Sequence, residues 1–159
     1  MLYTIVVGNA IKKLRTMNLR LNILAIFVLT ASTLAGQAVK KCDGNILLIT
    51  SRKVGKLDQY EIRHFLLTFG EECRDNAEYS EWSNELLFSL LDKQTELTLR
   101  TIEKDEKKIA IDEILEDLNS PVNDLVNVRS LILKVDQVAI NERLKKQIIE
   151  NLKKADTVN

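Results

Sequence analysis

Histidine, proline, glycine and tryptophan are scarce in this chain of 159 residues, which has one histidine, one proline, five glycines and one tryptophan. No second histidine exists to build a zinc site with His64. The chain also has no glycine-rich phosphate loop, no glycine-flanked serine of the nucleophile-elbow type and no asparagine glycosylation sequon. These absences lower the expectation of an enzyme but do not exclude one, because catalytic groups meet in space rather than in sequence.

No acidic residue precedes Asp43. The charged side chains of residues 1–38 are therefore all basic, and they are Lys12, Lys13, Arg15 and Arg20. The apolar run from Ile23 to Leu34 is shorter than the roughly 20 residues that span a membrane. It is followed by small residues up to Ala38. A basic segment, a short apolar run and a small-residue end indicate a secretory signal peptide, so we expect residues 1–38 to be removed.

Two alternatives for residues 1–38 stay open, namely an uncleaved membrane anchor and a helix buried in the core. Met17 is a candidate start, because a signal peptide of ordinary length begins there. A lipoprotein signal is not expected, since Cys42 does not directly follow the small residues. The expected location is the bacterial periplasm or the extracellular space, and with an anchor it is the outer face of a membrane.

The remainder of the chain is mildly acidic. Four of the 23 basic residues lie in residues 1–38, so residues 39–159 have 19 basic and 23 acidic residues, a net charge of −4. Binding to nucleic acid rests on the neutralisation of phosphates and is not expected here. Membrane contact is expected only through residues 1–38, if they are retained. A segment of 121 residues has the size of one ordinary domain.

Both cysteines, Cys42 and Cys73, lie after the expected cleavage site. An even number of cysteines in an oxidising compartment predicts a disulfide, which would hold the N-terminal segment against the end of the first helix. The alternative is two unrelated free thiols.

The hydrophobic pattern predicts an all-α fold. We expect residues 39–57 to be an extended lead-in or a short helical turn, because the apolar piece Ile46–Ile49 has no partner strand. From Asp58, a candidate N-cap, apolar residues return with a helical period. Ser120 followed by Pro121 predicts a further helix start. The expected helices cover about 58–69, 77 or 80 to 91, 95–103, 106–118, 121–136 and 141–154.

Short connections between these helices favour a compact irregular bundle of five or six antiparallel helices over residues 58–155, preceded by the signal or anchor helix. The spacing of the helix pairs at 77–103 and 106–136 also fits stacked helical hairpins. No residue pattern recurs between the two pairs, however, so the irregular bundle is the expectation we adopt.

Candidate site residues are few, and no catalytic, metal-ligating or cofactor-binding set is expected. His64 lies at the border between the apolar and solvated sides of its helix. The acidic segment Glu71–Glu85 has the spacing of a solvated helix face around Glu78 and Glu81 and lacks the spacing of a calcium loop. Trp82 is expected to be a core anchor, and if it is partly exposed it becomes a candidate contact residue.

These features predict an exported helical protein that acts as a protein-interaction or structural module, with another protein as its partner. The alternative is a small-ligand-binding protein or an enzyme that uses the acidic segment Glu71–Glu85 with His64. Carboxylates that converge beside His64 would favour the alternative, whereas an exposed apolar patch would favour a partner surface.

Overall fold

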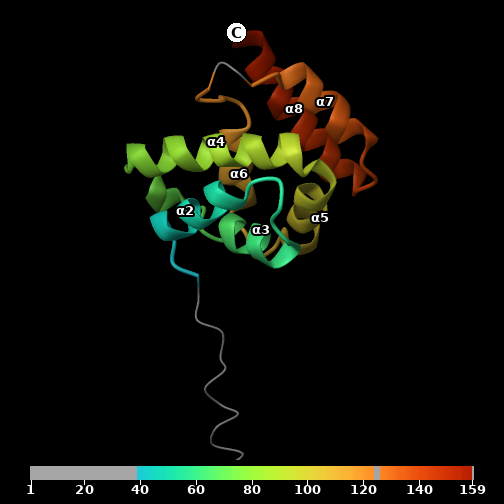
Figure 1. Ribbon diagram of the computed structural model, residues 1–159. Coiled ribbons are helices and arrows are strands. Elements are labelled where there is room, and N and C mark those ends of the chain that lie inside the picture. The colour runs from blue at the N-terminus through green and yellow to red at the C-terminus, as the bar shows by residue number, and fades with distance from the viewer. Residues whose placement is uncertain (1–38, 124–125, 159) are drawn as a thin grey trace, which may run out of the picture. The chain divides into compact units, whose positions relative to one another are not determined.

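The computed structural model describes residues 39–123 and 126–158, and this part of the chain is all-helical, as predicted (Figure 1). It contains no strand within these residues. The signal or anchor predicted for residues 1–38 lies outside the described residues. The elements are α2 (Gly44–Lys53), α3 (Gln59–Leu66), the 3-10 helix η2 (Glu71–Cys73), α4 (Ala77–Lys93), α5 (Thr95–Asp105), α6 (Ile111–Asp117), α7 (Val128–Gln137) and α8 (Glu142–Val158).

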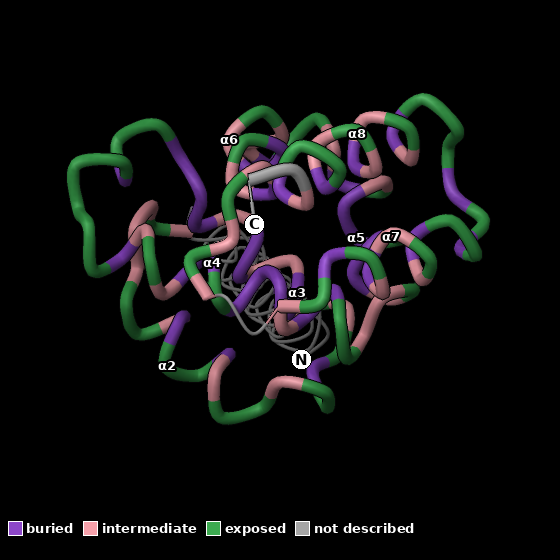
Figure 2. Tube along the Cα trace, turned by 90° about the horizontal axis from the view of Figure 1, so that it is seen from above, coloured by how far each residue is buried: buried purple, intermediate pink, exposed green. Residues whose placement is uncertain are grey.

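Helix α4 is the centre of the described part and packs against α2, α5 and α7. In Figure 1, α2 and α3 lie below α4, while α7 and α8 lie above it. Helix α3 also packs on α5, and α8 packs on both α6 and α7. Buried and exposed positions alternate along the helices in Figure 2, as expected where each helix turns one side to a common core. The largest fully buried side chains are Phe65, Phe88, Leu47, Ile62, Leu66, Leu87, Leu90, Leu91, Leu99, Ile102, Ile114 and Leu118.

The predicted cap at Asp58 is confirmed, and it forms a complete capping box. Its side chain accepts a hydrogen bond from the Glu61 backbone N–H at 2.8 Å, while the Glu61 carboxylate accepts one from the Asp58 N–H at 3.1 Å. Each group satisfies a donor that the first turn of a helix leaves unpaired. This box fixes where α3 begins.

The extended lead-in or short helical turn expected for residues 39–57 understates this segment, because it contains the ten-residue helix α2. The Asp43 side chain caps α2 by accepting from the Asn45 N–H at 2.9 Å. Only Leu47 and Thr50 of α2 are buried, so the helix shows too little apolar periodicity to be recognised from sequence. Its stability comes from packing on α3 and α4, which no local pattern reveals.

The helix start predicted at Ser120–Pro121 is also wrong. Helix α7 begins at Val128, where the Asn127 side chain accepts from the Ser130 N–H at 2.9 Å. The segment before it is held in a non-helical path by the side chain of Asn84 in α4. The Asn84 amide donates to the carbonyls of Asp117 at 3.0 Å and Ser120 at 3.2 Å, and its oxygen accepts from the Val122 N–H at 3.1 Å.

Among the described residues, no helix combines the length and the apolar character needed to cross a membrane.

Candidate functional site

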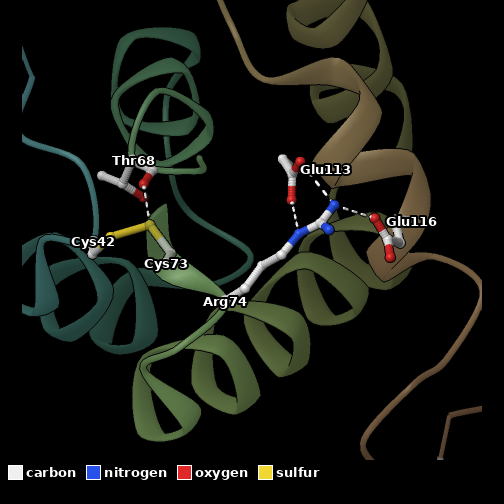
Figure 3. A network of polar contacts seen from close by, with 6 residues as sticks. All are labelled: Cys42, Thr68, Cys73, Arg74, Glu113 and Glu116. Atoms are coloured by element: carbon white, nitrogen blue, oxygen red, sulfur yellow. Dashed lines mark hydrogen bonds and ion pairs between the residues drawn. A yellow bond between two sulfur atoms is a disulfide. The ribbon is translucent and has the colours of Figure 1, made fainter. Parts of the chain in front are cut away.

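The predicted disulfide between Cys42 and Cys73 is confirmed and joins the segment before α2 to η2, with 5.5 Å between the two Cα atoms (Figure 3). The Cys42 N–H donates to the Thr68 carbonyl at 2.9 Å, and the Lys41 ammonium donates to the carbonyl of Phe69. The Cys73 sulfur lies 3.5 Å from the Thr68 carbonyl oxygen but has no proton to donate. Because the bridge uses both cysteines of the chain, a Cys–His nucleophile is not available to His64.

Arg74, next to the bridge, links η2 to α6 (Figure 3). Its Nε and Nη2 atoms donate to the two Glu113 oxygens at 2.8 and 3.0 Å, and Nη2 also donates to Glu116 at 2.5 Å. The hydrogen bond and charge of Glu113, followed by the charge of Glu116, raise the pKa of Arg74. This bidentate contact links α6 to η2 and engages two of the three guanidinium nitrogens of Arg74.

Asp117, at the end of α6, is the most perturbed carboxyl group of the described residues. Burial raises the pKa of Asp117 to about 6, helped by the negative charges of Glu113 and Glu116 and opposed by Arg74. The hollow beside it has a volume of about 30 Å³ and is lined partly by Tyr79. A space of this size takes a water molecule rather than an organic ligand.

The buried side chain of Tyr79 lines the same small hollow as Asp117. Its hydroxyl donates to the Thr68 hydroxyl at 2.5 Å, and the Thr68 hydroxyl donates in turn to the Phe65 carbonyl at 2.6 Å. Burial raises the pKa of Tyr79 to about 12, although the hydrogen bond to Thr68 opposes this. The chain of hydrogen bonds is therefore a neutral structural network.

His64 lies on α3 beside an apolar depression of about 100 Å³ between α2 and α3. The ring of His64 contacts that of Tyr60 one turn earlier, with 4.1 Å between the ring centroids. Tyr60 is 63 % exposed and Ile49 of α2 is 51 % exposed, which is high for large apolar side chains. We call this hollow the apolar depression; it is lined by Ile46, Ile49, Thr50, Leu57, Tyr60, Glu61 and His64.

Among the described residues, Glu61 supplies the only carboxylate of that lining, and this carboxylate already has partners. Lys53 donates to Glu61 at 2.5 Å, and the Asp58 N–H donates to its other oxygen. The hydrogen bond from Lys53 and that from the Asp58 backbone lower the pKa of Glu61. Glu61 is therefore a bound anion in a mostly apolar wall, not a free base for His64.

The acidic segment Glu71–Glu85 does not reach His64. Glu78 and Glu81 are exposed on α4, and none of the carboxylates of the segment lines the apolar depression. Trp82 is partly buried and packs against the core. Within the part of the chain that the structure describes, no three histidine, cysteine or acidic side chains gather as a metal ion would require.

A second hollow of about 360 Å³ adjoins the first and shares Tyr60 with it. We call it the basic groove; it is lined by Gln59, Tyr60, Arg63, Lys104, Asp105 and Lys108. Asp105 lies beneath it, 3 % exposed, with its carboxylate 3.0 Å from Arg63 Nε and 3.2 Å from Lys108 Nζ. Burial would raise the pKa of Asp105, but the hydrogen bonds and charges of Lys108 and Arg63 outweigh it and lower the pKa.

Tyr60 and Ile49 are the contact candidates that sequence reasoning missed. Tyr60 stands outside the apolar stripe of Ile62, Phe65, Leu66 and Phe69, and an aromatic side chain on the solvated side of an amphipathic helix is a usable signal. Ile49 gives no such signal, because the sequence pattern does not identify α2 as a helix.

The chain matches no family model, no curated protein and no solved structure.

Proposed function

We propose that the protein is an exported, compact irregular helical bundle that binds another protein through the apolar depression between α2 and α3. The observation that carries the proposal is the grouping of exposed Ile49 and Tyr60 around a hollow with one already bound carboxylate. Exposed aromatic and aliphatic side chains around a concave site are typical of partner contacts.

Export is supported by two independent features. Residues 1–38 have the charge and apolar pattern of a signal peptide, with an uncleaved anchor as the alternative. Disulfides form and persist in oxidising compartments, and the chain has one between Cys42 and Cys73. Mass spectrometry of the protein from the extracytoplasmic fraction tests this, with an N-terminus at Val39 expected. Accumulation of the chain in the cytoplasm would contradict export.

Position-specific photo-crosslinking tests the binding surface. A photoreactive phenylalanine analogue replaces Tyr60 in the full-length chain, in the cells that produce the protein. A second chain carries the analogue at Leu133, which is 65 % exposed on α7 and serves as the matched control. We expect one partner protein to be crosslinked from position 60 and not from position 133. Equal crosslinking from both positions, or crosslinking from neither, would contradict the proposal.

A ligand-binding or catalytic role for the segment Glu71–Glu85 with His64 has less support. The segment's carboxylates are not among the residues around His64, and the His64 ring contacts Tyr60 instead. A binding role for the apolar depression needs neither catalytic group nor cofactor.

A further inference from the structure

The inference rests on the proposed function and names the chemistry of the partner. We propose that the partner presents an acidic peptide segment in which one aliphatic side chain stands next to two or more carboxylates. The aliphatic side chain occupies the apolar depression, and the carboxylates lie in the basic groove.

The two hollows are adjacent because both use Tyr60. Tyr60 forms part of the wall of the apolar depression and of the basic groove. Residues of α2 supply part of the apolar wall, while Arg63 of α3 and two lysines at the end of α5 and just after it supply the cations. A peptide that crosses Tyr60 therefore meets an apolar and then a cationic surface within a short length of chain. Tyrosine suits this position, since its ring packs against apolar groups while its hydroxyl stays wet.

The charges of the basic groove leave an excess of positive charge. Arg63 and Lys108 share the single negative charge of Asp105, and Lys104 adds a third cation. The groove residues thus carry three positive charges and one negative charge, although residues 39–159 as a whole carry −4. A cationic groove on an acidic domain selects an anionic partner and steers its approach.

The volume of the apolar depression limits what it accepts. About 100 Å³ accommodates one aliphatic side chain but not an extended apolar helix face. The Lys53–Glu61 pair at its rim is neutral overall, so the depression itself has no charge preference. Specificity for acidic residues must therefore come from the basic groove.

Two other occupants fit less well. A second copy of the chain in a symmetric dimer would place one basic groove near the other, and like charges repel. A membrane surface takes up protruding apolar side chains, whereas this site is hollow.

Selection from a library of random peptides displayed on phage tests the inference, with the immobilised full-length protein as the target. We expect the enriched peptides to combine one leucine, isoleucine or valine with at least two nearby aspartates or glutamates. Their affinity should fall steeply between 50 and 500 mM salt, because exposed charges carry part of the binding.

Two matched pairs of variants locate the contacts. Lys104→Glu reverses the charge of a groove lysine that donates a 3.4 Å hydrogen bond to Gln59. Lys107→Glu makes the same charge change at a residue that does not line the groove. Ile49→Ser removes an apolar wall, whereas Leu48→Ser makes the same change beside it. We expect Lys104→Glu and Ile49→Ser each to weaken binding of the selected peptides by about tenfold, and their controls to change it less than twofold.

The outcomes separate the inference from the proposed function. If Ile49→Ser abolishes binding but Lys104→Glu and salt do not affect it, the acidic partner is refuted while the binding surface stands. If no enriched peptide distinguishes Ile49→Ser from Leu48→Ser, both are refuted. A dimer in sedimentation that Tyr60→Ala dissociates, or binding to vesicles with 30 % phosphatidylglycerol that Ile49→Ser removes, would also overturn the peptide assignment.

Discussion

Replacing Asp117 by asparagine should stabilise the protein at neutral pH. The carboxyl group is partly buried beside Glu113 and Glu116, and its pKa is raised from 3.8 to about 6, first by burial and then by these two charges. No hydrogen bond to this carboxylate is found among the described residues. Asparagine has nearly the same shape and keeps the site neutral, so it removes the cost of the charge without removing a recorded contact.

The size and the sign of this effect follow from proton linkage. Between pH 3.8 and about 6, the folded chain binds more protons at Asp117 than the unfolded chain does. The free energy of unfolding therefore falls as the pH rises through this window, and the full cost is present above pH 6. The difference between the two pKa values corresponds to at most about 3 kcal/mol. Because the side chain is only partly buried, solvent screening reduces the expected gain to about 1–2 kcal/mol.

Urea unfolding at two pH values is the assay. At pH 7.5, Asp117→Asn should raise the free energy of unfolding by about 1–2 kcal/mol, and at pH 4.5 the gain should shrink to about a third of that value. Asp75→Asn, at an exposed position before α4, is the matched control and should show no such pH-dependent gain. An equal gain at both pH values, or a loss at pH 7.5, would refute the electrostatic reasoning. A carbon-13 titration of the Asp117 carboxyl would check its pKa directly.

Two further predictions concern the contacts that hold the chain between helices. Removing the disulfide with Cys42→Ala and Cys73→Ala should lower the free energy of unfolding by about 3–4 kcal/mol, since the bridge closes a loop with a sequence separation of 31 residues. The wild type in a reducing agent should have the same free energy of unfolding as the double variant. A fall in the free energy of unfolding of less than about 1 kcal/mol would contradict this prediction. Asn84→Ala leaves three backbone groups without their side-chain partner and should cost about 2–3 kcal/mol in thermal or urea unfolding. Ser89→Ala, at a half-buried position on the same helix, is the control.

The existence of the helices from Asp58 onward could be predicted because their signals are local, although α7 begins later than Ser120 and Pro121 indicate. The Asp58 capping box spans four residues, from Asp58 to Glu61, and the apolar residues of α3 repeat every three or four positions. The junction between α4 and α5 is another case, since apolar side chains stop at Leu91 and resume at Leu97. Such patterns require no knowledge of the rest of the chain.

The parts that could not be predicted depend on side chains distant in sequence. Gln94 holds the turn between α2 and α3, because its amide oxygen accepts from the N–H groups of Gly55 at 3.0 Å and Leu57 at 3.2 Å. Its amide nitrogen donates to the Leu57 carbonyl at 2.7 Å. Asn84 fixes the segment after α6 in the same manner. An isolated glutamine or asparagine inside a helical pattern gives no sign of such a role.

The apolar depression itself escaped prediction for a related reason. One of its walls is α2, and the other is the outer side of α3. The sequence makes His64 a candidate because histidine is chemically distinctive. The arrangement of Ile49 and Tyr60 around the apolar depression, in contrast, depends on the packing of α2 onto α3. The acidic segment drew attention through its composition, although its carboxylates lie on exposed surface.

Packing on α3 and α4 is not the only support of the wall that α2 forms. A helix of ten residues is not stable in isolation, and only two residues of α2 are buried against the rest of the chain. The disulfide at Cys42 holds the chain before α2, and Gln94 holds the chain after it, where Gly55 adopts a left-handed φ of 87°. The helix is thereby fixed from both ends before any partner arrives. Under the proposed function, a site preformed in this way spares the proposed partner the entropy cost of ordering α2, so a short peptide segment would suffice for recognition.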